Sequence, residues 1–386
     1  MKDKAAAMAH EGWRLKLAER GTQGNQRRLK VTTGMKDFVS NDYLGLARNQ
    51  TLYELIKLRM EEVELPNKNG SGGSRLLSGN SELYEALEEL LAALFKAESC
   101  LVFNSGYQAN LALIAAVPQK GDTILYDQLS HICLKEGAWL SKAESVMFAH
   151  NDLEDLERKL KLAKGERFIV IESVYSMDGD FSPLTDIVSL AKMYDAKIII
   201  DEAHSTGVRV ADGAGWCVQE GLHEHIFARV YTFGKAMGVH GACIAGSASL
   251  KEYLINFARP FIYTTALPLH SVVSIEQSFQ YLAHNMHLQE ALRQRIGVFR
   301  EGIQSIQSAS EKLFYPGSDT AIQPLIVPGN EFSKAVAEKL QQQGFDVRPI
   351  LAPTVKKGAE RLRVSLHVHN STEDIQQLLK ALEKCL

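Results

Sequence analysis

The chain has 386 residues, of which 45% are hydrophobic and 23% charged, an ordinary composition for a globular protein with a large core. Its formal net charge is −3, from 43 basic and 46 acidic side chains, which argues against a general attraction to nucleic acid or to an anionic membrane. The five cysteines show neither CxxC spacing nor clustering with histidine, which argues against a zinc site and against a disulfide framework.

The N-terminal segment predicts an arm that is attached to a larger body. Residues 1 to about 30 mix charges with Trp13, Leu15 and Leu17 in a helical pattern and end in a polar run. The segment has no apolar stretch of the length that a signal peptide or a membrane span requires, so we expect a cytoplasmic location. We place domain boundaries at 1–45 for the arm, 46–275 for a large domain and 276–386 for a small domain.

Strands and helices alternate from about residue 99 to 250, and this alternation predicts an α/β fold with a mostly parallel sheet flanked by helices. Three consecutive isoleucines, Ile198 to Ile200, suit a strand that is buried on both faces. The expected strands are one that begins at Ser99, before a Ser-Gly turn, and those at Thr123–Tyr126, Phe168–Glu172, Ile198–Asp201 and Arg229–Phe233.

The C-terminal part predicts a small α+β domain after a long helical stretch from Ser271 to about Ser305. Its strands are expected at 321–327, 346–350 and 361–366, with one helix ending near Gln343 and a final helix whose leucines share one face.

Two glycine-containing turns could approach a ligand. Gly70–Arg75 lies outside any strand-to-helix context, so it is a weak phosphate signal and a better candidate for close backbone approach to a ligand or a subunit. Ser105-Gly106 opens a helix after a strand, and the N–H groups at a helix start form a ready site for an anion.

The most informative polar residues follow two predicted strands. Asp201 ends the isoleucine strand, His204 follows three residues later, and Lys235 follows the next strand. Because ligands of open α/β sheets bind at the carboxyl ends of the strands, these side chains could meet. Pyridoxal phosphate has a ring nitrogen that an aspartate can bind and an aldehyde that a lysine can bind as a Schiff base, so Asp201 and Lys235 suit this cofactor. Taken alone, Asp201 could be a simple helix or turn cap, and Lys235 could lie in a solvated turn. A Rossmann dinucleotide site is disfavoured, because no GxGxxG motif opens a helix after a first strand.

The motifs SNDYLGL, GSGGSR, LSH, SMDGD, DEAHSTG and TFGKAMGVHGA, in this order from Ser40 to Ala242, resemble those of the α-oxoamine synthases. These are fold-type-I pyridoxal phosphate enzymes that join an amino acid to an acyl-CoA. The resemblance therefore implies a fold-type-I PLP-dependent transferase with an N-terminal arm and a small C-terminal α+β domain.

The resemblance also implies roles for individual residues. Lys235 would form the Schiff base, Asp201 would hold the ring nitrogen protonated, and His204 would act near the ring oxygen together with Ser176. Further cofactor contacts would come from Ser105, Gly106, Tyr107, His131 and Thr232, and from Thr264 and Thr265 of the other subunit of a homodimer. Substrate contacts would come from Asn41, Thr354 and Arg363.

Within the family, the motifs look most like those of the branch that condenses L-alanine with a pimeloyl thioester in biotin synthesis. The sister branches, which use glycine with acetyl-CoA or succinyl-CoA, or serine with palmitoyl-CoA, remain alternatives. Arg27 and Arg28 are the candidates for binding the distal carboxylate of the acyl chain. A second hypothesis from another class is a PLP-binding protein without synthase activity.

Overall fold

A computed structural model describes residues 11–63, 69–209 and 212–386. The chain forms two compact units. The large unit comprises Asn41–Gln294 and His367–His369, and the small unit comprises the chain up to Ser40 together with Arg295–Leu366 and Asn370–Leu386. The three domains expected from the sequence, with boundaries after residues 45 and 275, stay a prediction.

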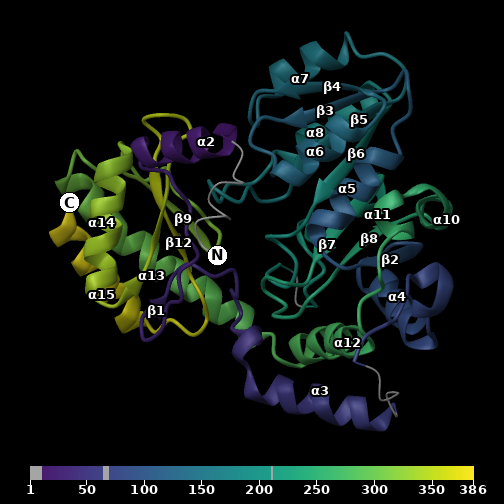
Figure 1. The fold of residues 1–386 in the computed structure, drawn as a ribbon, viewed down its shortest axis with the longest axis horizontal. Coiled ribbons are helices and arrows are strands. Elements are labelled where there is room, and N and C mark those ends of the chain that lie inside the picture. The colour runs from purple at the N-terminus through teal and green to yellow at the C-terminus, as the bar shows by residue number, and fades with distance from the viewer. Residues whose placement is uncertain (1–10, 64–68, 210–211) are drawn as a thin grey trace. The chain divides into compact units, whose positions relative to one another are not determined.

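A seven-stranded sheet forms the centre of the large unit, in the order β2-β8-β7-β6-β5-β3-β4 (Figure 1). The neighbouring strands β7, β6, β5, β3 and β4 all run parallel, whereas β8 is antiparallel to both of its neighbours, β2 and β7. The predicted mostly parallel α/β sheet is therefore confirmed. The bounds are β2 Ser99–Phe103, β3 Thr123–Asp127, β4 Glu144–Phe148, β5 Arg167–Glu172, β6 Ala196–Asp201, β7 Ala228–Thr232 and β8 Ala242–Gly246.

Helices cover both faces of this sheet, which explains the apolar strands (Figure 1). Ile199 packs in a core with residues of α5 (Gly106–Ala116) and α6 (Ile132–Leu140). Ile198 and Ile200 point the other way, into a core with residues of α7 (Leu153–Leu160) and α8 (Leu184–Met193). This alternation follows from the two-residue period of a strand.

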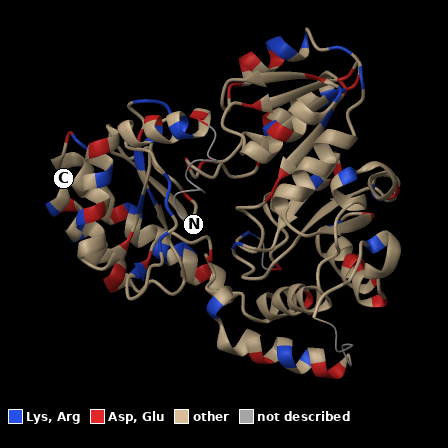
Figure 2. Ribbon diagram, in the orientation of Figure 1, with Lys and Arg blue, Asp and Glu red and all other residues tan. Residues whose placement is uncertain are grey.

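The other helices of the large unit include α12, which ends at His284, and α13, which begins at His287 and continues into the small unit. The long helical stretch predicted from Ser271 to about Ser305 thus consists of two helices. Helix α3 carries both acidic and basic residues, drawn red and blue in Figure 2. The remaining bounds are η1 Leu46–Arg48, α3 Gln50–Glu62, η2 Arg75–Gly79, α4 Glu82–Leu94, α9 Trp216–Gln219, η3 His223–His225, α10 Ala248–Phe257, α11 Arg259–Ile262, α12 Leu269–His284 and α13 His287–Ala309.

The small unit has the predicted α+β character. Its sheet is antiparallel in the order β11-β12-β9, and β1 pairs with β10 in a separate parallel ladder that joins the N-terminal segment to the C-terminal one. Helix α2 buries none of its residues. The bounds are α2 Glu11–Thr22, β1 Lys36–Asp37, β9 Ile322–Ile326, α14 Asn330–Gln342, β10 Phe345–Asp346, β11 Arg348–Ile350, β12 Arg361–Ser365 and α15 Thr372–Cys385. Across the described ranges, no helix is long and apolar enough to cross a bilayer.

Candidate active site

A cavity of about 290 Å³ opens at the carboxyl ends of β5, β6 and β7 in the large unit. It brings together nine of the residues predicted from the sequence: Asn41, Ser105, Gly106, Tyr107, His131, Asp201, His204, Thr232 and Lys235. It is also lined by polar residues that the sequence analysis did not select, namely Asn110, Cys133, Glu172 and His240.

Asp201 is the last residue of β6 and is 6% exposed. Its Oδ2 accepts a hydrogen bond from Nδ2 of Asn110 at 2.6 Å, and its Oδ1 accepts one from the backbone N–H of Ala203 at 2.8 Å. These two donors fix the orientation of the carboxylate. A buried, oriented carboxylate of this kind can bind a cationic ring nitrogen.

Glu172 ends the neighbouring strand β5 and is 3% exposed. Burial, and then the nearby charge of Asp201, raise the pKa of the Glu172 carboxyl to about 8. One of its oxygens accepts a hydrogen bond from the backbone N–H of His131. The edge of the sheet therefore carries two adjacent carboxyl groups, of which Glu172 holds a proton at neutral pH.

Lys235 lies in the turn after β7, and its Nζ is 2.9 Å from Nε2 of His204. The other ring nitrogen of His204 is 2.7 Å from the hydroxyl of Tyr43. The lysine amine is thus held by an imidazole that is itself held from the far side.

The start of α5 provides the features of a phosphate site. Ser105 is the N-cap of the helix, with its Oγ accepting from the N–H of Gln108 at 3.3 Å. A Cβ at Gly106 would overlap Cγ2 of Thr232, so the strand end and the helix start are in close contact. The Thr232 hydroxyl is buried and has no hydrogen-bond partner among the described residues. A phosphate oxygen would satisfy this hydroxyl beside the helix N-terminus.

His131 is the N-cap of α6, and its Nδ1 is 2.9 Å from the thiol of Cys133. Burial lowers the pKa of His131 and raises the pKa of the Cys133 thiol. The imidazole is therefore neutral at neutral pH, which suits stacking on a flat ring better than a charged imidazolium would.

The remaining predicted residues lie outside this cavity. Ser176 is in the turn that follows β5, and Thr264 lines a smaller cavity with Asn104, whose Nδ2 donates to the carbonyl of Thr265 at 2.9 Å. Arg363 is on β12 of the small unit, where its Nη1 donates to Oγ of Ser365 at 3.1 Å.

Thr354 lines a separate cavity of about 440 Å³ within the small unit. Five cationic side chains and one carboxylate line the same cavity: Arg20, Arg27, Lys30, Lys334 and Arg348, with Glu338. Arg28 is not among the lining residues, and its Nη2 donates instead to Oε1 of Gln26 at 3.3 Å. The cavity has the charge to bind an anionic group.

A model of the family described as aminotransferase class I and II matches residues 33–382. The chain belongs to this family. It is 36% identical to an 8-amino-7-oxononanoate synthase of Methylobacillus flagellatus over 98% of this chain and 97% of that protein. A relative with the same name from Emericella nidulans is 38% identical, over 90% of this chain and 88% of its own length.

Solved structures of similar proteins agree with the fold. A serine palmitoyltransferase solved with PLP has a TM-score of 0.86 and 26% identity, covering 97% of this chain and 96% of its own. An 8-amino-7-oxononanoate synthase from Francisella tularensis has a TM-score of 0.77 and 26% identity, covering 91% and 97%. The predicted fold-type-I transferase and the resemblance to α-oxoamine synthases are confirmed.

Proposed function

We propose that this family member is a PLP-dependent acyltransferase that condenses L-alanine with a pimeloyl thioester, releasing CO₂ and the thiol and giving 8-amino-7-oxononanoate for biotin synthesis. The observation that carries the choice of substrates is the similarity over nearly the full length to relatives that are named for this product. The cavity of the large unit supplies the required groups. Pyridoxal phosphate, when bound, supplies the electron sink that lets an amino acid lose its α-proton.

The residues of the cavity fit this cofactor at both ends. Asp201, fixed by Asn110, would bind the protonated ring nitrogen, and His131 would lie against the ring. The N–H groups that start α5 and the unsatisfied hydroxyl of Thr232 would bind the phosphate. Lys235 would hold the aldehyde carbon through its amine.

Proton transfer is the task of Lys235. Its Nζ would accept the α-proton of the amino acid as a general base. His204, 2.9 Å from Nζ, keeps this amine oriented and can polarise the incoming acyl carbonyl. Asn41 lines the same cavity and would bind the carboxylate of the amino acid, a role that we also propose for Arg363.

The basic cavity of the small unit is our candidate for an anionic group of the acyl substrate. Arg27 and Thr354 both line it, and its five cations outnumber its one carboxylate. The distal carboxylate of a pimeloyl chain and the phosphates of a thioester carrier share this chemistry. A homodimer, with Thr264 and Thr265 acting in the site of the partner, and a cytoplasmic location both stay predictions.

A second substrate pair has a specific observation in its favour, since serine palmitoyltransferases are among the solved structures with the higher TM-scores. Thiol release separates the two. The PLP-loaded protein is tested with L-alanine and pimeloyl-CoA, L-serine and palmitoyl-CoA, and glycine with acetyl-CoA or succinyl-CoA. We expect the first pair to be preferred. Preference for another pair would move the protein to a sister branch, and no release with any pair would favour a non-catalytic PLP-binding protein.

Lys235→Ala is the matched control for the chemistry. We expect it to lose both turnover and the absorbance of the cofactor bound to the lysine amine, because no other lysine lines the cavity. A variant that keeps turnover would contradict the assignment of the lysine.

A further inference from the structure

Cys133 connects two of the residues that we propose to hold the cofactor. It is 2% exposed, and its Sγ lies 2.9 Å from Nδ1 of His131, the side chain proposed to lie against the cofactor ring. Its Sγ also accepts a hydrogen bond from Nδ2 of Asn110 at 3.4 Å, and the same Nδ2 donates to Oδ2 of Asp201 at 2.6 Å. A chain of three contacts therefore runs from Asp201 through Asn110 and Cys133 to His131.

The two middle members of this chain are held in place by the packing of α5 against α6. Asn110 lies on α5 and is 1% exposed, and its helix neighbours Ala109 and Ala112 share one hydrophobic core with Cys133 of α6. A Cβ added at Gly137 of α6 would lie only 2.9 Å from Cβ of Ile114 of α5, so the two helices are in close contact. Side chains in a core packed this closely keep defined orientations.

The hydrogens of this chain have one consistent arrangement. A carboxylate only accepts, so the amide of Asn110 turns one N–H toward Asp201 and has its second N–H for Sγ of Cys133. Nδ1 of His131 accepts the backbone N–H of Cys133 at 3.3 Å, so this nitrogen carries a lone pair. Within the described part of the chain, the thiol hydrogen has the same lone pair as its acceptor. The hydrogen of the neutral imidazole is then on Nε2.

We propose that Cys133 is a positioning residue for His131: its thiol donates to Nδ1 and, together with the backbone N–H of Cys133, keeps the imidazole neutral with its hydrogen on Nε2. The proposal rests on the proposed function only in taking His131 as the residue that lies against the cofactor ring. It gives a defined task to a buried thiol that the proposed mechanism does not otherwise use.

The charge of His131 matters because the cofactor ring would itself carry a positive charge. Asp201 would hold the ring nitrogen protonated, so an imidazolium against the same ring would add a like charge. Protonation of His131 would also place a hydrogen on Nδ1, and the thiol and the N–H of Cys133 would both lose their acceptor there. Buried donors without an acceptor are unfavourable. Cys133 therefore opposes the charge state that would repel the cofactor.

The other charged and titratable groups around His131 come from several elements and are unchanged when Cys133 is replaced. Burial is the first cause that lowers the pKa of His131, and two lysine charges lower it further, whereas one carboxylate charge raises it. The surrounding groups are Tyr107, Lys135, Glu172, Asp201, Lys235 and His240. A comparison among variants at position 133 therefore isolates the thiol donor from these groups.

The test follows the titration of His131 by NMR in the full-length, cofactor-free protein with ¹³C-labelled histidine, where His131→Gln identifies the signal. Cys133→Val fills the space of the thiol without a donor, Cys133→Ala removes the donor without adding bulk, and Cys133→Ser keeps a donor. We expect the first two variants to raise the titration midpoint of His131 by about half to one pH unit, the value of one net hydrogen bond. Cys133→Ser should leave the midpoint at or below that of the wild type. An unchanged midpoint in the donor-free variants, or an equal rise in Cys133→Ser, would overturn the proposal.

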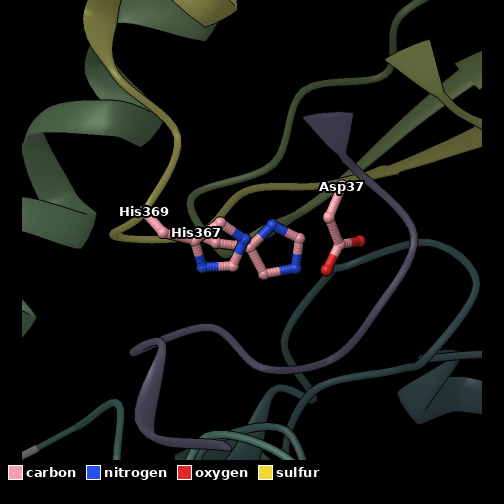
Figure 3. A group of neighbouring side chains, drawn as sticks. All are labelled: Asp37, His367 and His369. Carbon is pink, nitrogen blue, oxygen red and sulfur yellow. The ribbon is translucent and has the colours of Figure 1, made fainter. Parts of the chain in front are cut away.

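Two controls keep the result specific. Cys217→Ala removes another buried thiol of the large unit, from a residue whose N–H donates to Glu202, and should leave the midpoint unchanged. The stacked rings of His367 and His369, with centroids 4.5 Å apart, are not among the described residues that line the cavity and serve as an internal reference (Figure 3). A rise at His131 in Cys217→Ala, or an equal change in the reference pair, would mean a general change of structure and would also overturn the proposal. The titration needs neither cofactor nor acyl substrate, so it succeeds or fails independently of the substrate test.

Discussion

Glu172→Gln should change how the stability of the cofactor-free protein depends on pH. The buried Glu172 carboxyl has a pKa of about 8, against an ordinary value of 4.5, first because of burial and then because of the charge of Asp201. Between these two pH values the folded protein holds a proton that the unfolded chain releases. Folding is then coupled to proton uptake, so the free energy of unfolding falls as the pH rises from 4.5 to 8.

The size of this effect follows from the shift. The difference between a pKa of about 8 and the ordinary value of 4.5, at about 1.36 kcal/mol for each tenfold change in proton affinity, corresponds to a loss of up to about 5 kcal/mol of stability across this range. Glutamine resembles the protonated acid and cannot ionise. The variant should therefore match the wild type near pH 4.5 and exceed it in free energy of unfolding by several kcal/mol near pH 8.

Urea unfolding followed by circular dichroism, at pH values from 4.5 to 8.5, measures this difference directly. Glu202→Gln is the matched control, because Glu202 is also fully buried but accepts hydrogen bonds from the N–H groups of Trp216 and Cys217 and from the hydroxyl of Ser205. An amide has one acceptor oxygen fewer, so this variant should lose stability at every pH. Parallel pH profiles for Glu172→Gln and the wild type would refute the reasoning.

Two further predictions concern the structure around the cavity. Gly106→Ala should weaken PLP binding by between about fivefold and about a hundredfold, because the new methyl group overlaps Cγ2 of Thr232 and relief of an overpacked contact costs about 1–3 kcal/mol. A cofactor titration measures this loss, and an unchanged affinity would argue against close contact between the two residues. Burial alone would lower the pKa of His150, but the hydrogen bonds of its ring to Asp127 and Asp180 raise this pKa to about 10. The protonated His150 therefore contributes its full stabilisation below pH 6.5, and this stabilisation is lost as the pH rises through 10. His150→Gln should therefore unfold at lower urea concentration at pH 7 and show a smaller further loss toward pH 10, whereas equal midpoints at pH 7 would contradict this role.

The sequence predicts the parallel part of the fold well because the strands of an α/β sheet are short apolar runs separated by helices. It does not predict that β8 is antiparallel, since Ala242–Gly246 is as apolar as its neighbours and strand direction is set by the connection before it. It also misses the break between α12 and α13. The helical pattern continues across Asn285, but this residue leaves helical geometry with φ −131°.

The sequence predicts those residues of the candidate site that directly follow a strand, such as Asp201 and Lys235. Glu172 fits the same rule, because it is the first polar residue after the run Phe168–Ile171, and that signal was present in the sequence. Asn110 and Cys133 could not be selected in this way. They lie inside helices, and only the packing of α5 and α6 against the sheet brings them to the cavity.

The position of β8 in the sheet has a consequence for biosynthesis. Among the strands of the seven-stranded sheet β2 is made first, yet it pairs with β8 alone, so Ser99–Phe103 has no strand partner in this sheet until residues 242–246 leave the ribosome. Until then an apolar strand edge is exposed on the growing chain, where it could pair with other chains. The sheet is therefore complete only after residues 242–246 have been made, later than Lys235.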